Sequence, residues 1–295
     1  MAMVKIVVAD KLDEETVAEM KTKWRVVYQP ADLAAELRDA DALVVRSRTR
    51  VTKEMLDGAQ RLRLVARAGV GLDNIDVAEC ERRGIRVINT PSAATVSVAE
   101  LAIGLMLAVL RRVPRADAGM KRKQWLKKEL QGSELFGKTV GIVGFGRIGR
   151  AVAERLKAFG ARILISDPRG RTEQYWRAVS LEELLRESDI VTLHVALTDE
   201  TKGMMSRERL ALMKPSAILI NTSRGAVVDE DALYDALKGG RLAGAGIDVY
   251  SKEPYDGRLC ELENAVLTPH LGAETVEGQA RVGKELIEKL TEAFG

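Results

Sequence analysis

Short apolar runs alternate with amphipathic segments through the first third of the chain, and these runs are rich in valine, isoleucine and leucine. Runs of this length with β-branched residues are typical of buried strands. The segment Asp13–Lys23 has a helical period and starts with an acidic residue suited to a helix cap. Strands that alternate with helices predict a parallel sheet with helices on both faces. The predicted strands of this part are Lys5–Ala9, Arg25–Tyr28, Ala42–Val45, Leu62–Ala66 and Arg86–Ile88.

A long apolar helix is predicted from about Ser97 to Leu110 and beyond, and the alternation restarts after it. Six strands separated by five crossovers are typical of a doubly wound dinucleotide-binding domain. One more helix, Glu274–Leu290, is expected to pack back on the first domain. The six strands are Thr139–Val143, Arg162–Ser166, Asp189–Leu193, Ala217–Asn221, Gly244–Ile247 and Ala265–Thr268. The helices between them include Ile148–Phe159, Leu181–Glu187, Ser206–Met213 and Asp229–Leu237.

The composition limits the classes of protein that this α/β pattern allows. A chain of 295 residues, 46% of them hydrophobic, is long enough for two domains with full cores. The formal net charge of +3 predicts neither a nucleic-acid nor a membrane partner. No apolar run approaches the roughly 18 residues of a membrane span. Cys80 and Cys260 are the only cysteines and stand outside any Cys/His cluster, so neither a disulfide framework nor a metal site is expected.

Two further segments bear on where the protein works. The amino terminus passes directly into the first predicted strand without the charged region and cleavage site of a signal peptide, so we expect a cytoplasmic protein. The stretch Arg111–Lys128 is rich in lysine and arginine and contains Trp125. We interpret this stretch as a solvated helix face or a dimer arm rather than a nucleic-acid surface.

The segment Gly144-Phe145-Gly146-Arg147-Ile148-Gly149 lies between a predicted strand and a predicted helix. In this context Gly144 allows a tight turn, Gly146 lets the backbone approach a pyrophosphate, and Gly149 allows close packing of the helix on the strand. The free N–H groups at the start of the helix suit the pyrophosphate. The loop therefore predicts a dinucleotide site.

An acidic residue further along the chain points to the type of dinucleotide. Asp167 ends the next predicted strand, at the spacing of the acid that binds the hydroxyls of the adenine ribose. A carboxylate in this place repels a 2′-phosphate and so favours NAD over NADP. Arg169 and Arg171 follow closely and weaken that preference.

The chain has two histidines, His194 and His270, and each stands at or just after the carboxyl end of a predicted strand, where such sheets bind ligands. Hydride transfer to and from a 2-hydroxy acid needs an acid/base for the hydroxyl proton and a cation for the carboxylate. A carboxylate beside an imidazole also fixes its tautomer. His270, Arg224 and Glu253 suit these three roles, since Arg224 and Glu253 follow other strand ends.

Four motifs, in their order and spacing, resemble those of the D-isomer-specific 2-hydroxyacid dehydrogenase family, and the resemblance covers essentially the full chain. By this resemblance Arg224, Glu253 and His270 are catalytic, and Asp248 holds the nicotinamide carboxamide. The motifs are Val143-Gly144-Phe145-Gly146-Arg147-Ile148-Gly149, Asn221-Thr222-Ser223-Arg224-Gly225, Asp248 through Pro254, and Thr268-Pro269-His270-Leu271-Gly272. The expected cofactor-binding residues are Gly144, Gly146, Arg147, Ile148, Gly149, Asp167, Thr222, Asp248, His270 and Gly272.

The resemblance also implies the domain organisation. Residues 97–272 are expected to form a Rossmann NAD-binding domain. This domain is inserted into a flavodoxin-like substrate-binding domain of residues 1–96 and 273–295. The expected fold class is therefore α/β, with two doubly wound parallel-sheet domains.

Three stretches of the first half point to one branch of the family: Val44–Thr49, Arg67–Asp76 and Asn89-Thr90-Pro91. In these stretches the chain is most similar to the short phosphoglycerate dehydrogenases, which implies oxidation of D-3-phosphoglycerate to 3-phosphohydroxypyruvate in serine biosynthesis. Backbone N–H groups near Gly69 and Gly71 suit a substrate carboxylate. Arg46 and Arg67 are expected to face the phosphate, which arginine binds with a bidentate fork. The expected substrate-binding residues are Arg46, Ser47, Arg67, Gly69, Val70, Gly71 and Arg224, with Arg111 as a further cation that a partner subunit could supply.

Two departures from the phosphoglycerate dehydrogenase pattern keep other substrates open. The chain has Ser92-Ala93-Ala94 where that enzyme usually has Asn-Gly-Asn, and Ala196 where a proline is common. A glyoxylate or hydroxypyruvate reductase, or another D-2-hydroxyacid dehydrogenase, is the first alternative. A dinucleotide-sensing protein similar to the C-terminal-binding corepressors is an alternative of another class.

The expected partners are a small 2-hydroxy acid that carries a phosphate and a second copy of the chain, in a homodimer or a dimer of dimers. Neither nucleic acid nor a membrane is expected as a partner. The chain ends soon after the last predicted helix. Serine feedback through a C-terminal regulatory domain is therefore not expected.

Overall fold

A computed structural model describes residues 3–171 and 176–295 of the chain, and it confirms the predicted α/β class with two parallel sheets. The chain forms two compact units, one of Met1–Ala94 with Ala273–Gly295 and one of Thr95–Gly272. The sequence predicts the first boundary after residue 96, two residues later. Each unit is described by itself below.

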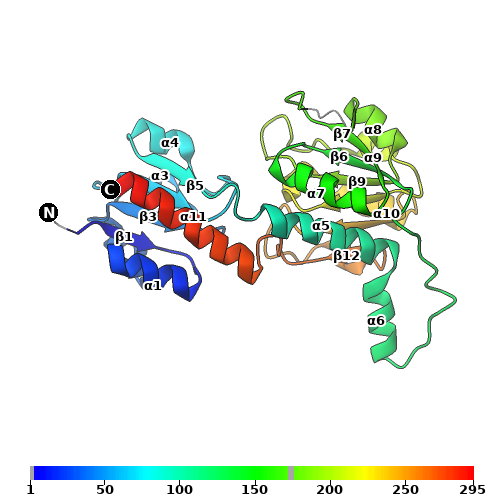
Figure 1. Cartoon of the computed structure of the whole chain (residues 1–295), viewed down its shortest axis with the longest axis horizontal. Helices are drawn as coiled ribbons and strands as arrows, with labels where there is room; N and C mark the ends of the chain where they lie inside the picture. The colour runs from blue at the N-terminus through cyan, green and yellow to red at the C-terminus, as the bar shows by residue number, and fades with distance from the viewer. Residues whose placement is uncertain (1–2, 172–175) are drawn as a thin grey trace. The chain divides into compact units, whose positions relative to one another are not determined.

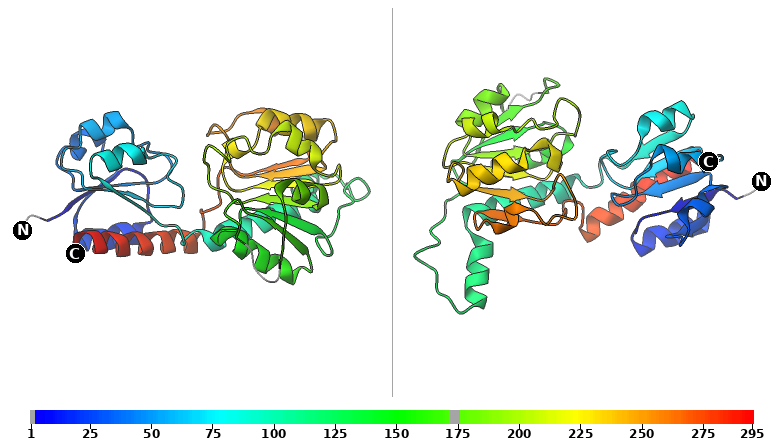
Figure 2. Two further views of the ribbon diagram at one scale, coloured as in Figure 1. Left: turned by 90° about the horizontal axis from the view of Figure 1, so that it is seen from above. Right: turned by 180° about the vertical axis from the view of Figure 1, so that it is seen from behind.

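The first unit has a five-stranded parallel sheet in the order β2-β1-β3-β4-β5. This is the strand order of the flavodoxin-like fold. Helices α1 and α11 cover one face of the sheet, and α2, α3 and α4 cover the other (Figures 1 and 2). The strands are β1 Lys5–Val8, β2 Arg25–Tyr28, β3 Ala42–Val45, β4 Leu64–Arg67 and β5 Arg86–Asn89. The helices are α1 Glu14–Lys23, α2 Leu33–Leu37, α3 Lys53–Asp57, α4 Val77–Arg82 and α11 Val276–Phe294.

The last helix of the chain, α11, completes the core of the first unit. Its buried residues Val282 and Leu286 pack in one cluster with Ile6 of β1 and Met20 of α1. A Cβ atom on Gly283 would lie 1.7 Å from Oγ1 of Thr16, so α11 and α1 approach this closely only because the residue is glycine. The expectation that the last helix packs on the first domain is therefore confirmed.

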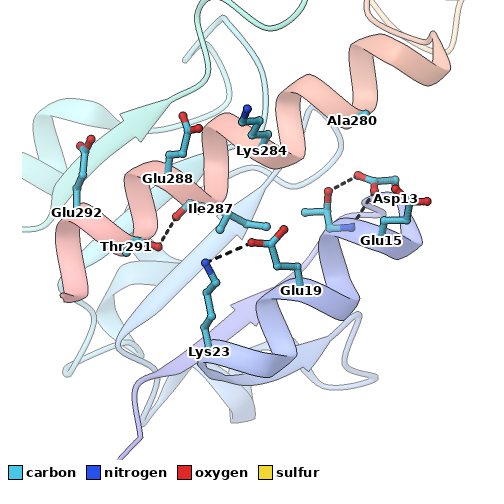
Figure 3. A pocket seen from close by; sticks show the side chains of 11 residues that line it. Asp13, Glu15, Glu19, Lys23, Ala280, Lys284, Ile287, Glu288, Thr291 and Glu292 are labelled. Atoms are coloured by element: carbon cyan, nitrogen blue, oxygen red, sulfur yellow. Dashed lines mark hydrogen bonds and ion pairs between the residues drawn. The ribbon is translucent and has the colours of Figure 1, made fainter.

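A surface groove of about 590 Å³ lies between α1 and α11 (Figure 3). Its lining is mostly charged and includes an ion pair between Lys23 and Glu19, with 3.2 Å between nitrogen and oxygen. None of the site residues expected from the sequence lines this groove. The predicted chemistry therefore lies elsewhere in the fold.

The second unit has a seven-stranded parallel sheet in the order β12-β11-β10-β9-β6-β7-β8, the Rossmann order with one strand added at an edge. The predicted number of six strands is wrong, because it omits β8 between β7 and α8. This strand has two exposed residues and lacks the apolar run that marks a strand in a sequence. The strands are β6 Thr139–Val143, β7 Arg162–Ser166, β8 Arg177–Ala178, β9 Ile190–Leu193, β10 Ile218–Asn221, β11 Gly244–Ile247 and β12 Ala265–Leu267.

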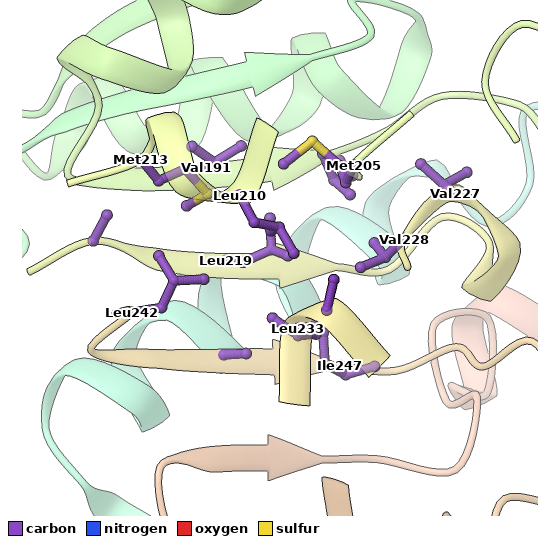
Figure 4. Packing of buried hydrophobic residues seen from close by; sticks show 14 of the residues in the cluster. Val191, Met205, Leu210, Met213, Leu219, Val227, Val228, Leu233, Leu242 and Ile247 are labelled. Atoms are coloured by element: carbon purple, nitrogen blue, oxygen red, sulfur yellow. The ribbon is translucent and has the colours of Figure 1, made fainter. Parts of the chain in front are cut away.

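Helices pack on both faces of this second sheet, as predicted. Residues of α5 and α7 share one apolar cluster with the strands, and residues of α8, α9 and α10 share another. Figure 4 shows part of the second cluster, where Leu210 of α9 and Leu233 of α10 lie against Leu219 of β10. The helices are α5 Thr95–Leu110, α6 Val113–Lys121, α7 Arg147–Ala158, α8 Leu181–Glu187, α9 Arg207–Leu212 and α10 Glu230–Lys238.

The long apolar helix ends at Leu110 instead of continuing into the basic stretch, which corrects one sequence prediction. Arg112 has a left-handed backbone with φ of 52°, and a new helix, α6, starts at Val113. Pro114 lies in the first turn of α6, where its missing N–H group is harmless. In the interior of one continuous helix the same proline would remove a hydrogen bond. Within the described ranges, no helix has the length and apolar character needed to cross a bilayer.

Candidate active site

The residues expected to bind cofactor and perform the chemistry gather at one edge of the second sheet. Because all seven strands are parallel, their carboxyl ends share that edge. The chain order reverses between the neighbouring strands β6 and β9, and ligands of doubly wound sheets bind outside such a reversal. The glycine loop follows β6, and the segments with Arg224, Asp248 and His270 follow β10, β11 and β12.

The three glycines of the loop each occupy a position that a side chain would disturb differently. Gly144 has φ of 90°, and a Cβ there would lie 2.6 Å from the carbonyl oxygen of His194. A Cβ on Gly149 would lie 2.2 Å from the carbonyl oxygen of Gly144, so α7 packs tightly on the loop. A Cβ on Gly146 would meet only Nη1 of Arg171, at 3.5 Å. Gly144 and Gly149 are thus needed for the turn, and Gly146 leaves space above the helix start.

The amino terminus of α7 is suited to a phosphate. Gly146 is its N-cap and makes no side-chain capping bond, so the first N–H groups point into that space. Two buried side-chain atoms near the same edge, Oγ1 of Thr222 and Nδ1 of His194, have no hydrogen-bond partner among the described residues. An open cradle and orphaned polar atoms are what a bound dinucleotide would satisfy. The residues present therefore fit NAD.

The acid expected to bind the adenine ribose lies beside the glycine loop. One oxygen of Asp167 accepts a hydrogen bond from the backbone N–H of Phe145, at 2.6 Å, and the other accepts one from Arg169, at 2.7 Å. Both bonds hold the carboxylate at the end of β7, next to the turn that would hold the pyrophosphate. Binding of the adenine ribose by this carboxylate stays a prediction.

Asp248 is fully buried and organises the turn that carries His270. Its carboxylate accepts hydrogen bonds from Oγ1 of Thr268 at 2.6 Å and from the backbone N–H groups of Leu271 at 2.7 Å and Gly272 at 2.9 Å. Its own carbonyl accepts the backbone N–H of His270 at 2.8 Å. Burial raises the pKa of Asp248, and these hydrogen bonds only partly offset the rise. The sequence resemblance predicts that Asp248 holds the nicotinamide carboxamide. It does not predict the bonds from Asp248 to the turn that carries His270.

His270 and Glu253 form a bonded pair. Nδ1 of His270 lies 2.8 Å from Oε2 of Glu253, and more than a third of each side chain is exposed. The backbone of His270 has φ of 55°, which the bonds to Asp248 hold in place. Burial raises the pKa of the Glu253 carboxyl, but the hydrogen bond and charge of His270, together with the N–H of Tyr250 and the charge of Arg224, lower it overall. Glu253 is therefore a carboxylate, and it leaves Nε2 of the imidazole for another partner.

Arg224 lies close enough to this pair for its charge to lower the pKa of Glu253 further. Nη1 of Arg224 donates to the carbonyl of Ser223 at 2.6 Å, and Nδ2 of Asn221 donates to the carbonyl of Arg224 at 3.0 Å. These bonds fix the turn after β10. The structure thus brings together the acid/base, the carboxylate and the cation that the sequence predicts.

The expected substrate-binding residues lie in the first unit, at the carboxyl ends of β3 and β4. Gly69 has φ of 152° and lies under the guanidinium of Arg67, whose Nε donates to Oδ1 of Asn74 at 3.2 Å. Among the described residues, the backbone N–H groups of Val70 and Gly71 have no hydrogen-bond partner. Such a turn suits a carboxylate, as predicted.

Arg46 and Ser47 follow β3, and the structure gives Arg46 a partner that the sequence did not predict. Nη2 of Arg46 is bonded to Oε1 of Glu274. Ser47 is exposed. In the second unit, the first residues of α7 are the exposed Arg147 and the partly buried Ile148. The described part of the chain contains no group of three or more His, Cys, Asp or Glu residues that could hold a metal ion.

Three residues that matter at these edges escaped prediction: Asp10, Asn74 and Glu274. Asp10 is 4% exposed and accepts hydrogen bonds from the backbone of Arg46 at 2.6 Å and of Thr49 at 3.1 Å. Asp10 directly follows the strand at residues 5–9, and an acid at a strand end was the signal that could have found it. Glu274 carries no such signal, because it is a single acid in the turn before the last helix.

Comparison with known proteins defines the class of enzyme. The family described as "D-isomer specific 2-hydroxyacid dehydrogenase, NAD binding domain" matches residues 103–272, and the chain belongs to this family. It is therefore an NAD-dependent oxidoreductase of D-2-hydroxy acids, as the sequence resemblance predicted.

Individual relatives differ in the substrate that their names give. The chain is 43% identical to a hydroxypyruvate reductase of Thermotoga maritima, over the whole of both chains. It is also 43% identical to a D-3-phosphoglycerate dehydrogenase of Methanocaldococcus jannaschii, across 98% of this chain, but it spans only 57% of that relative's length. Among solved structures, a D-lactate dehydrogenase of Aquifex aeolicus complexed with NAD and lactic acid has a TM-score of 0.88 and 32% identity, with 98% and 95% of the two chains covered.

Proposed function

We propose that His270, Glu253 and Arg224 perform the reaction of this enzyme, the reversible oxidation of a small D-2-hydroxy acid to its 2-oxo acid. The observation that carries the proposal is the 2.8 Å bond between His270 and Glu253 at the edge where the glycine loop lies. NAD supplies the acceptor for the hydride from C2 when it is bound. The residues of the chain supply the proton transfer and the electrostatics.

His270 acts as the acid/base in this mechanism. The carboxylate of Glu253 accepts a hydrogen bond from Nδ1–H, which fixes the tautomer and leaves the Nε2 lone pair for the C2 hydroxyl of the substrate. As the hydride leaves C2, Nε2 takes the hydroxyl proton, and the carboxylate of Glu253 stabilises the imidazolium that forms. In the reverse direction the imidazolium returns that proton to the carbonyl oxygen.

Arg224 and the turn at residues 69–71 are proposed to hold the substrate. The guanidinium of Arg224 binds the substrate carboxylate and polarises the carbonyl at C2. The N–H groups of Val70 and Gly71 are proposed as additional donors to the carboxylate, because they have no other partner among the described residues. These roles give substrate binding to residues of both units and the redox chemistry to the second.

Two substrates are candidates for the particular reaction. The sequence favours D-3-phosphoglycerate, supported by 43% identity to the dehydrogenase of that name from M. jannaschii. Hydroxypyruvate, the second candidate, is supported by 43% identity to the T. maritima reductase and by the Ser92-Ala93-Ala94 departure. The two substrates differ chiefly in the phosphate on C3.

We also propose that the protein works as a homodimer. The region of α6 and the segment after it exposes the side chains of Val113 to 52%, Met120 to 55% and Trp125 to 77%. Apolar side chains that gather in one segment are typical of an interface. A Trp125→Glu variant is expected to shift the mass measured by light scattering towards the monomer, and an unchanged mass would contradict the role of this segment.

A substrate panel tests the proposed reaction. The purified protein is given NADH with hydroxypyruvate, glyoxylate or 3-phosphohydroxypyruvate, and NAD with D-3-phosphoglycerate, D-glycerate or D-lactate at alkaline pH. We expect absorbance changes at the nicotinamide band with D-isomers and none with L-isomers. NADH binding without turnover of any acid would overturn the proposal and favour a dinucleotide-sensing protein.

A further inference from the structure

Arg46, the residue that the sequence assigns to a substrate phosphate, already forms an ion pair within the chain. Arg46 projects from the carboxyl end of β3, and its Nη2 is bonded to Oε1 of Glu274, from the turn that precedes α11. Nη1 of Arg46 donates to the carbonyl of Lys11 at 3.3 Å. Both terminal nitrogens of the guanidinium are thus engaged within the first unit.

The backbone beneath Arg46 is held on both sides, so the arginine extends from a fixed base. The buried carboxylate of Asp10 accepts the N–H groups of Arg46 and Thr49 and the hydroxyl of Thr49 at 2.7 Å. Nδ2 of Asn74 donates to the carbonyls of the same two residues, at 2.7 Å and 2.6 Å. This arrangement anchors the backbone from which the pair with Glu274 is made.

Two carboxylates already lie in this network. Asp10 binds the backbone of Arg46, Glu274 binds its guanidinium, and Asn74 links the backbone of Arg46 to Arg67 through a 3.2 Å hydrogen bond. A phosphate that reached Arg46 would bring a charge near −2 within a few ångströms of the Glu274 carboxylate. Like charges at such a distance repel, and solvent screens the repulsion only in part, because 20% of the Arg46 side chain and 44% of the Glu274 side chain are exposed. A hydroxyl group in the same place would meet no such repulsion.

We infer that Glu274 is a specificity-determining residue that makes this enzyme select 2-oxo acids without a phosphate. The inference rests on the proposed function, since it needs Arg46 to face the C3 substituent of the substrate. Arg46 then donates to the C3 hydroxyl of a substrate such as hydroxypyruvate while Glu274 stays bonded to it. Phosphorylated acids are excluded by charge and not by size.

Replacing the carboxylate of Glu274 by an amide tests this inference. Glu274→Gln keeps the shape of the side chain and removes its charge. We expect the ratio of kcat/KM for 3-phosphohydroxypyruvate to that for hydroxypyruvate to rise about 10-fold to 100-fold, through a lower KM for the phosphorylated acid at unchanged kcat. Arg46→Ala added to Glu274→Gln is expected to abolish that rise.

A matched control comes from Glu277, an exposed acid in the first turn of α11 that forms no ion pair with Arg46. Glu277→Gln changes the net charge equally and is expected to leave the ratio within about twofold. If the wild type reduces 2-oxo acids but Glu274→Gln leaves the ratio at the Glu277→Gln value, the inference is overturned and the proposed function stands. A wild type that prefers the phosphorylated acid also overturns it. A wild type without turnover of any 2-oxo acid overturns the proposed function itself.

Discussion

The two sheets of this protein are wound alike, yet their first strand-to-helix turns differ in what caps the helix. In the first unit the N-cap of α1 is Asp13, whose carboxylate accepts the N–H of Thr16 at 2.9 Å and its hydroxyl at 2.5 Å. In the second unit the N-cap of α7 is Gly146, which offers no side-chain oxygen. One helix start is satisfied by the chain itself, and the other leaves its N–H groups for a ligand.

The difference shows that strand order alone does not decide where a dinucleotide binds. Both edges lie at a reversal of the chain order, β1 beside β3 in one sheet and β6 beside β9 in the other. A carboxylate at the helix start uses the same N–H groups and the same dipole that a pyrophosphate would use. The start of α1 is thus closed to a pyrophosphate by the carboxylate of Asp13, and the ends of the neighbouring strands are tied by Asp10 and Asn74.

The largest expected effect comes from breaking the chemistry of the second edge. His270→Asn removes the acid/base and is expected to lower kcat by about 10³-fold, within the range of general acid–base catalysis. The Kd for NADH, measured by fluorescence titration, should stay within about twofold of the wild type. A variant that retained more than a tenth of wild-type turnover would show that another group transfers the proton.

A second variant makes the open turn resemble the closed one. Gly146→Asp gives α7 the acidic N-cap that α1 has, and its Cβ would meet only Nη1 of Arg171, at 3.5 Å. We expect NADH affinity to fall by about 100-fold, because the carboxylate repels the pyrophosphate and takes its donors, while the melting temperature does not fall. Gly146→Ala is the control and should weaken binding less. Equal losses of NADH affinity in both variants would mean that the size of the side chain, and not its charge, weakens binding.

Acid sensitivity is expected to separate the two units, because both histidines of the chain lie in the second. Burial lowers the pKa of His194 to about 3 from 6.5. Below pH 6.5 the unfolded chain takes up a proton that the folded chain does not, so folding stability falls as the pH drops. His194→Gln should remove about 2 kcal/mol of the loss between pH 7 and pH 5, measured by denaturant unfolding. Parallel stability curves for variant and wild type would show that His194 is protonated in the folded state.

The smallest effect is expected from removing the acidic N-cap of α1 in the first unit. Asp13→Ala removes the cap of α1 and should cost about 1 kcal/mol of unfolding free energy. The affinity for NADH should stay unchanged, because the nucleotide site belongs to the second unit. A change in NADH affinity beyond about twofold would show that the two turns do not act independently.

Much of the fold could be predicted because it follows from local patterns. The apolar strands of both sheets stand out against polar turns, and β2, β3, β6, β7 and β11 have the predicted bounds. Strand β8 has two exposed residues and no such signal. The break before α6 depends on one left-handed residue, Arg112, that an apolar pattern does not reveal.

The site could be predicted as a set of residues but not as a set of bonds. The glycine loop and the strand-end residues carry their chemistry in the sequence, and His270 and Glu253 are only 17 residues apart. Arg46 and Glu274 are separated by 228 residues, and only the folded chain shows that they meet. The bonds of Asp248 to the His270 turn likewise depend on a strand neighbour rather than on a motif.

Helix α11 gives the first unit an order of assembly. The apolar cluster that joins Ile6 and Met20 to Val282 and Leu286 needs residues from both ends of the chain. During synthesis the five strands emerge first, and the helix that covers them follows about 190 residues later, roughly 10 to 40 seconds at ordinary translation rates. For that interval only α1 covers this face of the sheet, and the apolar residues that α11 will bury are open to chaperones. The NAD-binding unit is continuous in sequence, so it is synthesised completely before the last helix of the first unit.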